Sequence, residues 1–218
     1  MKKIGLLVAV EIEAVLRRYG NPRKTLEYPG YSVMVYQSEG YELYVLKSGA
    51  GEIFAASGVQ FLISVIGVDL IVNYGIVGGL TKEIGEVRTC VVEAAVHYDM
   101  DTSEADEYEP GRYPGYPDIW LYATKELVEK ALETVPGLKA VKCASGDKFV
   151  GDPRDKQALH EKYGADICEM EAAGIILVCH RNQVPCLLIK TVADSLFAAC
   201  PSGHHSIVAV PFVGVSQR

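Results

Sequence analysis

Three carboxylate side chains stand at places where α/β folds commonly keep their sites. Glu169 and Glu171 flank Met170 just where an apolar helix is predicted to begin. Asp194 ends the apolar run 184–194, which predicts a buried strand. The carboxyl end of such a strand faces the ligand crevice of an open parallel sheet, where a carboxylate can bind a ligand or transfer a proton. A helix cap is the alternative for each acid, because free N–H groups and the helix dipole attract negative charge.

The elements that must position these acids alternate along the chain. Buried strands are predicted at 4–10, 69–73, 87–96, 139–144 and 184–194, with a hairpin of two strands at 31–37 and 41–47. Helices are predicted at 11–19, 53–66, 122–134, 153–163 and 170–181. The segment 98–120 is predicted to be a long excursion, and the glycine-rich segment 74–79 suits close approach of a ligand. The pattern favours an α/β fold with a mixed sheet covered by helices.

Composition narrows the classes of partner. The 218 residues suit one domain, and 28 acidic against 21 basic residues, with no long run of either sign, make nucleic acid and anionic membranes poor partners. The six cysteines are scattered without a CxxC pair, as in the reduced core of a cytosolic protein. No apolar window reaches the length of a membrane span, and neither a signal peptide nor an anchor is visible. We expect a cytoplasmic protein that acts on a small molecule.

Six short motifs carry a resemblance to a known family. They are Ala9-Val-Glu-Ile-Glu13, Ser48-Gly-Ala-Gly51, Asn73-Tyr-Gly-Ile-Val-Gly-Gly79, Ala144-Ser-Gly-Asp-Lys-Phe149, Glu169-Met-Glu171 and Thr191-Val-Ala-Asp194. Their order resembles that of the purine nucleoside phosphorylase/nucleosidase superfamily, and most of all its 5'-methylthioadenosine/S-adenosylhomocysteine nucleosidases. The resemblance implies a three-layer αβα sandwich around a mixed, partly closed sheet, and a homodimer. It also implies hydrolysis of the N-glycosidic bond of an adenine nucleoside, without metal or cofactor.

The resemblance assigns two catalytic carboxylates. Asp194 matches the acid that protonates adenine N7, which requires burial to raise its pKa. Taken alone, a strand-end Asp would more often cap the next turn. Glu13 matches the carboxylate that orients and deprotonates the attacking water. Its neighbour Glu11 competes for this role but is better explained as a solvated first-turn residue of the helix.

The resemblance also assigns the substrate-binding residues. Glu171 matches the residue that binds the ribose hydroxyls, Met170 packs against the ribose, and Glu169 belongs to the same group or caps the helix. Phe149 matches the ring that stacks on adenine, and backbone groups of Val150 read the purine edge. Gly78 is a close-approach position. For Met170 and Phe149 a contact within the core is the alternative.

Hydrolysis is favoured over phosphorolysis, because the strand 69–75 carries no arginine to hold a phosphate. The chain departs from the nucleosidase pattern at Ile76 and Val77 (usually Ser-Ala), Lys190 (usually arginine) and Ala193 (usually serine). Three alternatives therefore stay open: a purine nucleoside phosphorylase, a hydrolase for another purine nucleoside such as futalosine, and a nucleoside-binding protein that has lost activity.

The chain is predicted to hold a single nucleoside phosphorylase/nucleosidase-like domain at 1–197 and an atypical tail at 198–218. The tail lacks a helical period where the fold would lead us to expect a closing helix. Its two histidines, His204 and His205, have no partner at ligand spacing and are expected to be surface residues rather than metal ligands.

Overall fold

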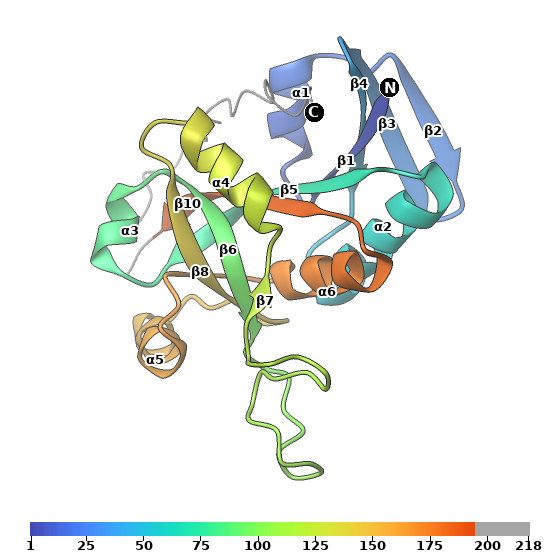
Figure 1. Cartoon of the computed structure of the whole chain (residues 1–218). Helices are drawn as coiled ribbons and strands as arrows, with labels where there is room; N and C mark the ends of the chain where they lie inside the picture. The colour runs from blue at the N-terminus through green and yellow to red at the C-terminus, as the bar shows by residue number, and fades with distance from the viewer. Residues whose placement is uncertain (195–218) are drawn as a thin grey trace.

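The computed structural model describes residues 1–194, so the expectations for the tail, for His204 and for His205 lie outside the described residues. The strands are β1 (Lys2–Val8), β2 (Lys24–Tyr28), β3 (Tyr31–Ser38), β4 (Tyr41–Lys47), β5 (Leu70–Gly79), β6 (Thr89–His97), β7 (Leu121–Tyr122), β8 (Lys139–Ser145), β9 (Ile167–Glu169) and β10 (Cys186–Asp194). The helices are α1 (Ile12–Tyr19), α2 (Glu52–Phe61), α3 (Lys82–Glu86), α4 (Lys125–Thr134), α5 (Pro153–Tyr163) and α6 (Ala172–Asn182). A π-helical turn, Leu62–Ile66, extends α2. Figure 1 shows their arrangement.

The strands form one mixed sheet that closes on itself at one end. Its order is β10-β6-β8-β9-β5-β1-β4-β3-β2, with β7 added to β6, and β10 pairs also with β5. That extra pairing closes β10, β6, β8, β9 and β5 into a ring, while β1 to β4 continue as an open sheet. Strands β1 and β10 each pair in parallel with β5, so the carboxyl ends of all three point the same way. The prediction of a mixed, partly closed sheet is confirmed.

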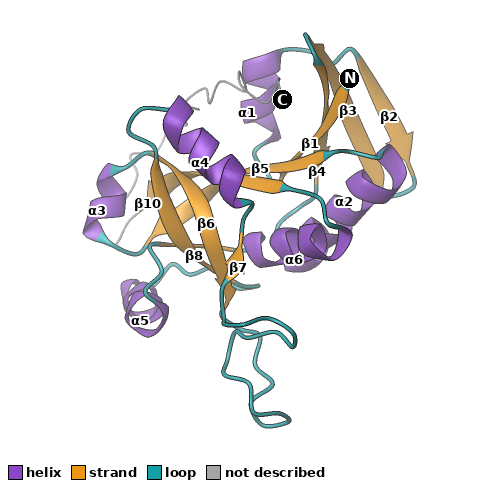
Figure 2. Ribbon diagram, in the orientation of Figure 1, coloured by secondary structure: helices purple, strands orange, loops and turns teal. Residues whose placement is uncertain are grey.

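Helices cover the sheet on two sides (Figure 2). The alternation along β1 gives the reason, since side chains of a strand point to opposite faces. Leu7 joins the large core that includes α2 and α6, whereas Leu6 and Val8 join a second core with Val15 of α1. Apolar side chains on both faces require cover on both, and this produces the three layers of the sandwich.

Two predicted elements differ most from the expectation, one in length and one in the type of helix. The predicted strand 69–73 continues through the glycine-rich segment to Gly79, because β10 and β9 pair with its last residues. The predicted helix 53–66 changes to a π-helical turn after Phe61 and ends at Gly67, whose φ of 72° is left-handed. The sequence prediction also missed the short elements β2, α3, β7 and β9, which offer too few residues for a periodic pattern.

The segment 98–120 is a long excursion without helix or strand, as predicted, and it extends away from the body of the molecule (Figure 1). Two ring contacts tie it to the fold: Tyr113 Oη lies 2.6 Å from His97 Nδ1, and Tyr116 Oη lies 3.2 Å from His180 Nδ1. Across residues 1–194, no helix has both the length and the apolar character needed to cross a membrane.

Candidate active site

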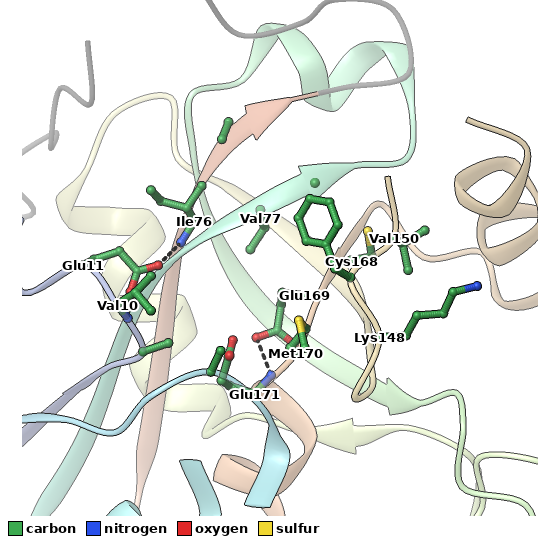
Figure 3. Close-up of a pocket in the computed structure, with 15 residues that line it drawn as sticks. Val10, Glu11, Ile76, Val77, Lys148, Val150, Cys168, Glu169, Met170 and Glu171 are labelled. Atoms are coloured by element: carbon green, nitrogen blue, oxygen red, sulfur yellow. Dashed lines mark hydrogen bonds between the residues drawn. The ribbon is translucent and has the colours of Figure 1, made fainter. Parts of the chain in front are cut away.

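A cavity of about 390 Å³ opens at the carboxyl end of the parallel strands (Figure 3). Such a volume is typical of a small-molecule site. The lining residues come from the β1–α1 turn, the β4–α2 loop, the end of β5, the loop after β8, β9 with the turn after it, and β10. They are Ala9, Val10, Glu11, Ala50, Ile76, Val77, Gly78, Lys148, Phe149, Val150, Cys168, Glu169, Met170, Glu171 and Ala193. The cavity therefore lies at the edge of the sheet where the sequence placed its carboxylates.

All six residues predicted to bind substrate line this cavity. They are Gly78, Phe149, Val150, Glu169, Met170 and Glu171. Phe149 is 81% exposed, which excludes the alternative that its ring fills the core. A large apolar ring left open at a cavity wall offers a flat face to a flat ligand.

The two predicted catalytic residues, Glu13 and Asp194, have less structural support than the six binding residues. Glu13 is exposed on the first turn of α1 and is absent from the cavity lining, whereas Glu11 lines the cavity. Asp194 ends β10 with its backbone opposite Gly78, beside the cavity-lining Ala193. Its side chain lies outside the described part of the chain. The prediction for each residue stays a prediction.

Glu11 is held at the cavity wall by backbone donors. Its Oε1 accepts from the N–H of Ile76 at 3.0 Å, and its Oε2 accepts from the N–H of Val10 at 2.9 Å. These bonds tie the β1–α1 turn to β5 and leave further lone pairs of the carboxylate free for a ligand. The sequence predicted that Glu11 is a solvated first-turn residue. The contact with Ile76 was missed because it depends on the pairing of β1 with β5, which no local pattern reveals.

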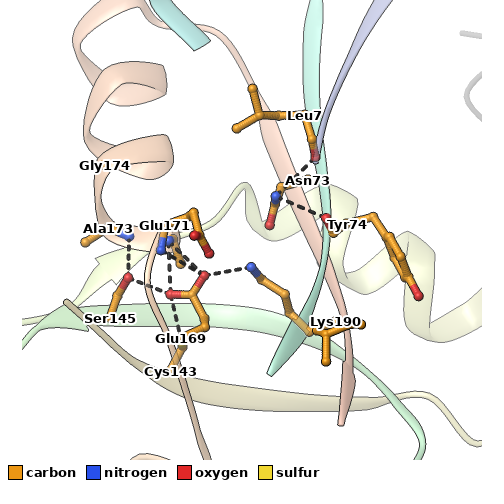
Figure 4. Close-up of polar contacts among 12 residues, drawn as sticks. Leu7, Asn73, Tyr74, Cys143, Ser145, Glu169, Glu171, Ala173, Gly174 and Lys190 are labelled. Atoms are coloured by element: carbon orange, nitrogen blue, oxygen red, sulfur yellow. Dashed lines mark hydrogen bonds and ion pairs between the residues drawn. The ribbon is translucent and has the colours of Figure 1, made fainter. Parts of the chain in front are cut away.

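Glu169 lines the cavity and forms a buried ion pair with Lys190 (Figure 4). Nζ lies 2.7 Å from Oε2, and the side chains are 1% and 2% exposed for Lys190 and Glu169. Glu169 also accepts from the N–H groups of Glu171 at 3.1 Å and Ala172 at 3.0 Å. Burial raises the pKa of Glu169, but Lys190, the hydroxyl of Ser145 and the N–H of Ala172 outweigh it, so the pKa lies below its usual value. Burial lowers the pKa of Lys190, but the negative charges of Glu169 and Glu171 leave it above its usual value.

Glu171 is fixed by the start of a different helix. Its Oε1 accepts from the N–H of Gly51, the residue before α2, at 2.9 Å. Burial and then the charge of Glu169 raise its pKa, with Lys190 opposing them. The turn 169–171 thus presents one carboxylate neutralised by a lysine and a second held by a backbone donor.

Behind this turn lies a contact that sequence analysis missed. Glu52 is 6% exposed, and its carboxyl group meets Ser145 Oγ and the N–H of Gly174. In the sequence Glu52 looks like any acidic residue in the first turn of a helix, and no local pattern signals that it is buried against a second helix.

The electrostatics of the cavity disfavour a phosphate ligand. Its described lining holds the carboxylates of Glu11, Glu169 and Glu171 and a single cation, Lys148. Lys148 already pairs with Asp155 at 2.8 Å. A phosphate dianion is normally held by arginine, and the described lining contains no arginine. Across residues 1–194, no group of three or more His, Cys, Asp or Glu side chains is arranged to hold a metal ion.

The chain is similar over most of its length to proteins of known name and structure. The 5'-methylthioadenosine/S-adenosylhomocysteine nucleosidase of Hydrogenovibrio crunogenus is 31% identical over 200 residues, covering 88% of this chain and 85% of that protein. The solved nucleosidase of the same name from Helicobacter pylori, bound to butyl-thio-DADMe-Immucillin-A, has a TM-score of 0.81 and 28% identity, covering 89% of this chain and 85% of its own. The native futalosine hydrolase of Helicobacter pylori has a TM-score of 0.82 and 27% identity, covering 88% and 84%.

The family model described as Phosphorylase superfamily matches residues 3–209, nearly the whole sequence. Because this match spans far more than half of the chain and the fold agrees with it, the chain belongs to the phosphorylase superfamily.

Proposed function

We propose that this protein hydrolyses the N-glycosidic bond of an adenine nucleoside, 5'-methylthioadenosine, S-adenosylhomocysteine or a similar compound, to adenine and the 5'-modified ribose. One observation carries the proposal: a single cavity unites the turn Glu169-Met170-Glu171 with the open ring of Phe149 and a carboxylate of the β1–α1 turn. The names of the similar nucleosidases support the choice of substrate.

Each part of the reaction has a residue suited to it. Cleavage leaves positive charge on the ribose and negative charge on the base. Glu171 binds the ribose hydroxyls and favours the developing positive charge, and Met170 packs against the sugar. Phe149 stacks on adenine, and the backbone of Val150 reads the purine edge. Asp194 is the proposed acid that protonates adenine N7, because it lies at the end of β10.

One carboxylate of the pair Glu11 and Glu13 holds the attacking water in this proposal. The resemblance assigns the role to Glu13, which is exposed on α1. The cavity favours Glu11, because its carboxylate is fixed at the wall by two backbone donors. Glutamine at each position in turn separates the two assignments.

Water is the proposed nucleophile, because three carboxylates and one already paired lysine offer little to phosphate. A second candidate, hydrolysis of futalosine, is favoured by the similarity to the Helicobacter pylori futalosine hydrolase. For the cellular setting we propose a cytoplasmic homodimer in methionine salvage. Two apolar side chains of α2 support the dimer, since Ile53 and Phe54 are 77% and 61% exposed.

The test is to incubate the purified protein with methylthioadenosine, adenosylhomocysteine, futalosine and inosine, each with and without phosphate, and to follow the free base by chromatography. Adenine release that is independent of phosphate is expected. Release that requires phosphate, or release from futalosine alone, would overturn the proposed reaction or substrate. Asp194→Asn is expected to abolish turnover while nucleoside binding, measured by calorimetry, persists; an active variant would remove Asp194 from the acid role.

A further inference from the structure

Glu52 occupies an unusual place for the first residue of a helix. A first-turn carboxylate normally stays in solvent, where the helix dipole stabilises it. Glu52 instead turns into the interior and contacts the start of α6, the helix that follows the cavity-lining turn 169–171. One oxygen meets Ser145 Oγ, and the other accepts from the N–H of Gly174.

The single hydroxyl proton of Ser145 limits the protonation state of Glu52. Ser145 Oγ contacts Oε1 of Glu52 and also Oε1 of Glu169, the latter at 2.6 Å, and it accepts from the N–H of Ala173 at 3.1 Å. A serine hydroxyl has one proton, so it can donate to only one of two carboxylates. If both were ionised, one close oxygen pair would have no proton between its atoms.

The proton must therefore reside on one of the two acids, and their surroundings differ. Glu169 has Lys190 at 2.7 Å, which stabilises its charge. Glu52 has no ion pair among the described residues. Burial, followed by the charge of Glu169, raises the pKa of Glu52 to about 8. Near neutral pH the arrangement that satisfies every atom has Glu52 protonated and donating to Ser145, which donates in turn to the charged Glu169.

The contact links two helix starts that hold the proposed ribose-binding acid. Gly51, adjacent to Glu52, donates its N–H to Glu171 at 2.9 Å, and the N–H of Glu52 itself binds Asp147 at 2.8 Å. Gly174 has to be glycine for this approach, since a Cβ there would lie 2.7 Å from Oε2 of Glu52. The position of Glu171 thus depends on how α2 and α6 are held together.

We propose that Glu52 is a positioning residue that acts in its neutral form, fastening the start of α2 to the start of α6 so that Glu171 faces the bound nucleoside. The nucleoside substrate in this inference rests on the proposed function, whereas the contact that holds α2 to α6 does not. Above about pH 8, Glu52 ionises beside Glu169 and the fastening weakens. The groups whose charges act on Glu52, or on which its own charge acts, are Glu169, Glu171 and Tyr113. Two further charged groups bind at the same junction: Asp147 at the N–H of Glu52 and Lys190 at Glu169.

The decisive variant is Glu52→Gln, which keeps the size and the ability to donate to Ser145 but cannot ionise. Steady-state kinetics from pH 6 to 10 should show wild-type activity declining above about pH 8, through a rise in KM, while the variant keeps its activity. At one pH unit above that value only about a tenth of wild-type molecules retain a neutral Glu52. The ratio of the variant's kcat/KM to that of the wild type should therefore be about tenfold higher there than at neutral pH. Glu83→Gln, at an exposed first-turn acid of α3, is the matched control and should follow the wild type.

Urea unfolding over the same pH range gives a second readout that needs no substrate. The raised pKa means that the folded state keeps a proton which the unfolded state loses. The stability that Glu52 contributes is therefore fully present below the ordinary glutamate pKa and is lost as pH rises through about 8. Glu52→Gln should remove this decline and Glu83→Gln should keep it. An unchanged decline in Glu52→Gln, or a Glu52→Gln protein as damaged at pH 7 as Glu52→Ala, would overturn the proposal. If the wild type released no base, the proposed function would fail while unfolding still decided the role of Glu52.

Discussion

Replacing Lys190 by methionine removes the positive member of the buried pair while nearly keeping the side-chain length. The remaining Glu169 carboxylate would be 2% exposed with no counter-ion. Removing one partner of a buried ion pair typically costs about 3–5 kcal/mol, because the other charge stays buried and uncompensated. Glu169 would keep donors from Ser145, Glu171 and Ala172, so we expect the lower end, about 3 kcal/mol.

Urea unfolding measures this cost directly, as a lower midpoint at an unchanged slope. For a domain of this size about 3 kcal/mol corresponds to a fall in Tm of roughly 6–12 °C. Lys125→Met is the matched control, since Lys125 is 82% exposed in its ion pair with Glu129 and should matter little. The difference between wild type and Lys190→Met should narrow as the pH falls toward the ordinary glutamate range, because a protonated Glu169 no longer needs the ammonium.

The double variant Glu169→Gln/Lys190→Met completes the cycle. With neither charge buried, it should recover part of the loss, giving a coupling of about 2 kcal/mol or more between the two positions. A cost below about 1 kcal/mol for Lys190→Met, or a double variant no more stable than the additive sum, would refute the reasoning that charge compensation holds this turn in place.

Three further changes test single features of the site. Gly174→Ala should lower the free energy of unfolding by about 1–3 kcal/mol, because its Cβ would meet Glu52 at 2.7 Å; a neutral effect in urea would show that α6 moves aside freely. Glu11→Gln should lower kcat by on the order of 10²-fold while Glu13→Gln leaves it near wild type, and the reverse result in steady-state kinetics would return the water to Glu13. Phe149→Ala should weaken nucleoside binding by about 1–3 kcal/mol in calorimetry without changing Tm, since the ring is 81% exposed; a large fall in Tm would instead mean that the ring packs in the core.

The sequence by itself determined the fold class and most of the cavity wall. Apolar periodicity located the long strands, and the paired acids around Met170 and the aromatic Phe149 stood in local patterns that survive folding unchanged. Such features are readable because they depend on neighbours in the chain. The strand 139–145 and the helix 153–163 lie almost where periodicity put them.

Only the tertiary structure decided which acids share an environment. Glu11 reaches the cavity because β1 pairs with β5, and Glu52 is buried because α2 packs against α6, so neither position has a local signature. The same holds for Lys190, which reads as one polar residue in an apolar strand until Glu169, 21 residues away, lies 2.7 Å from it. Charge and burial are set by contacts distant in the sequence, and a linear pattern does not encode which of those contacts form.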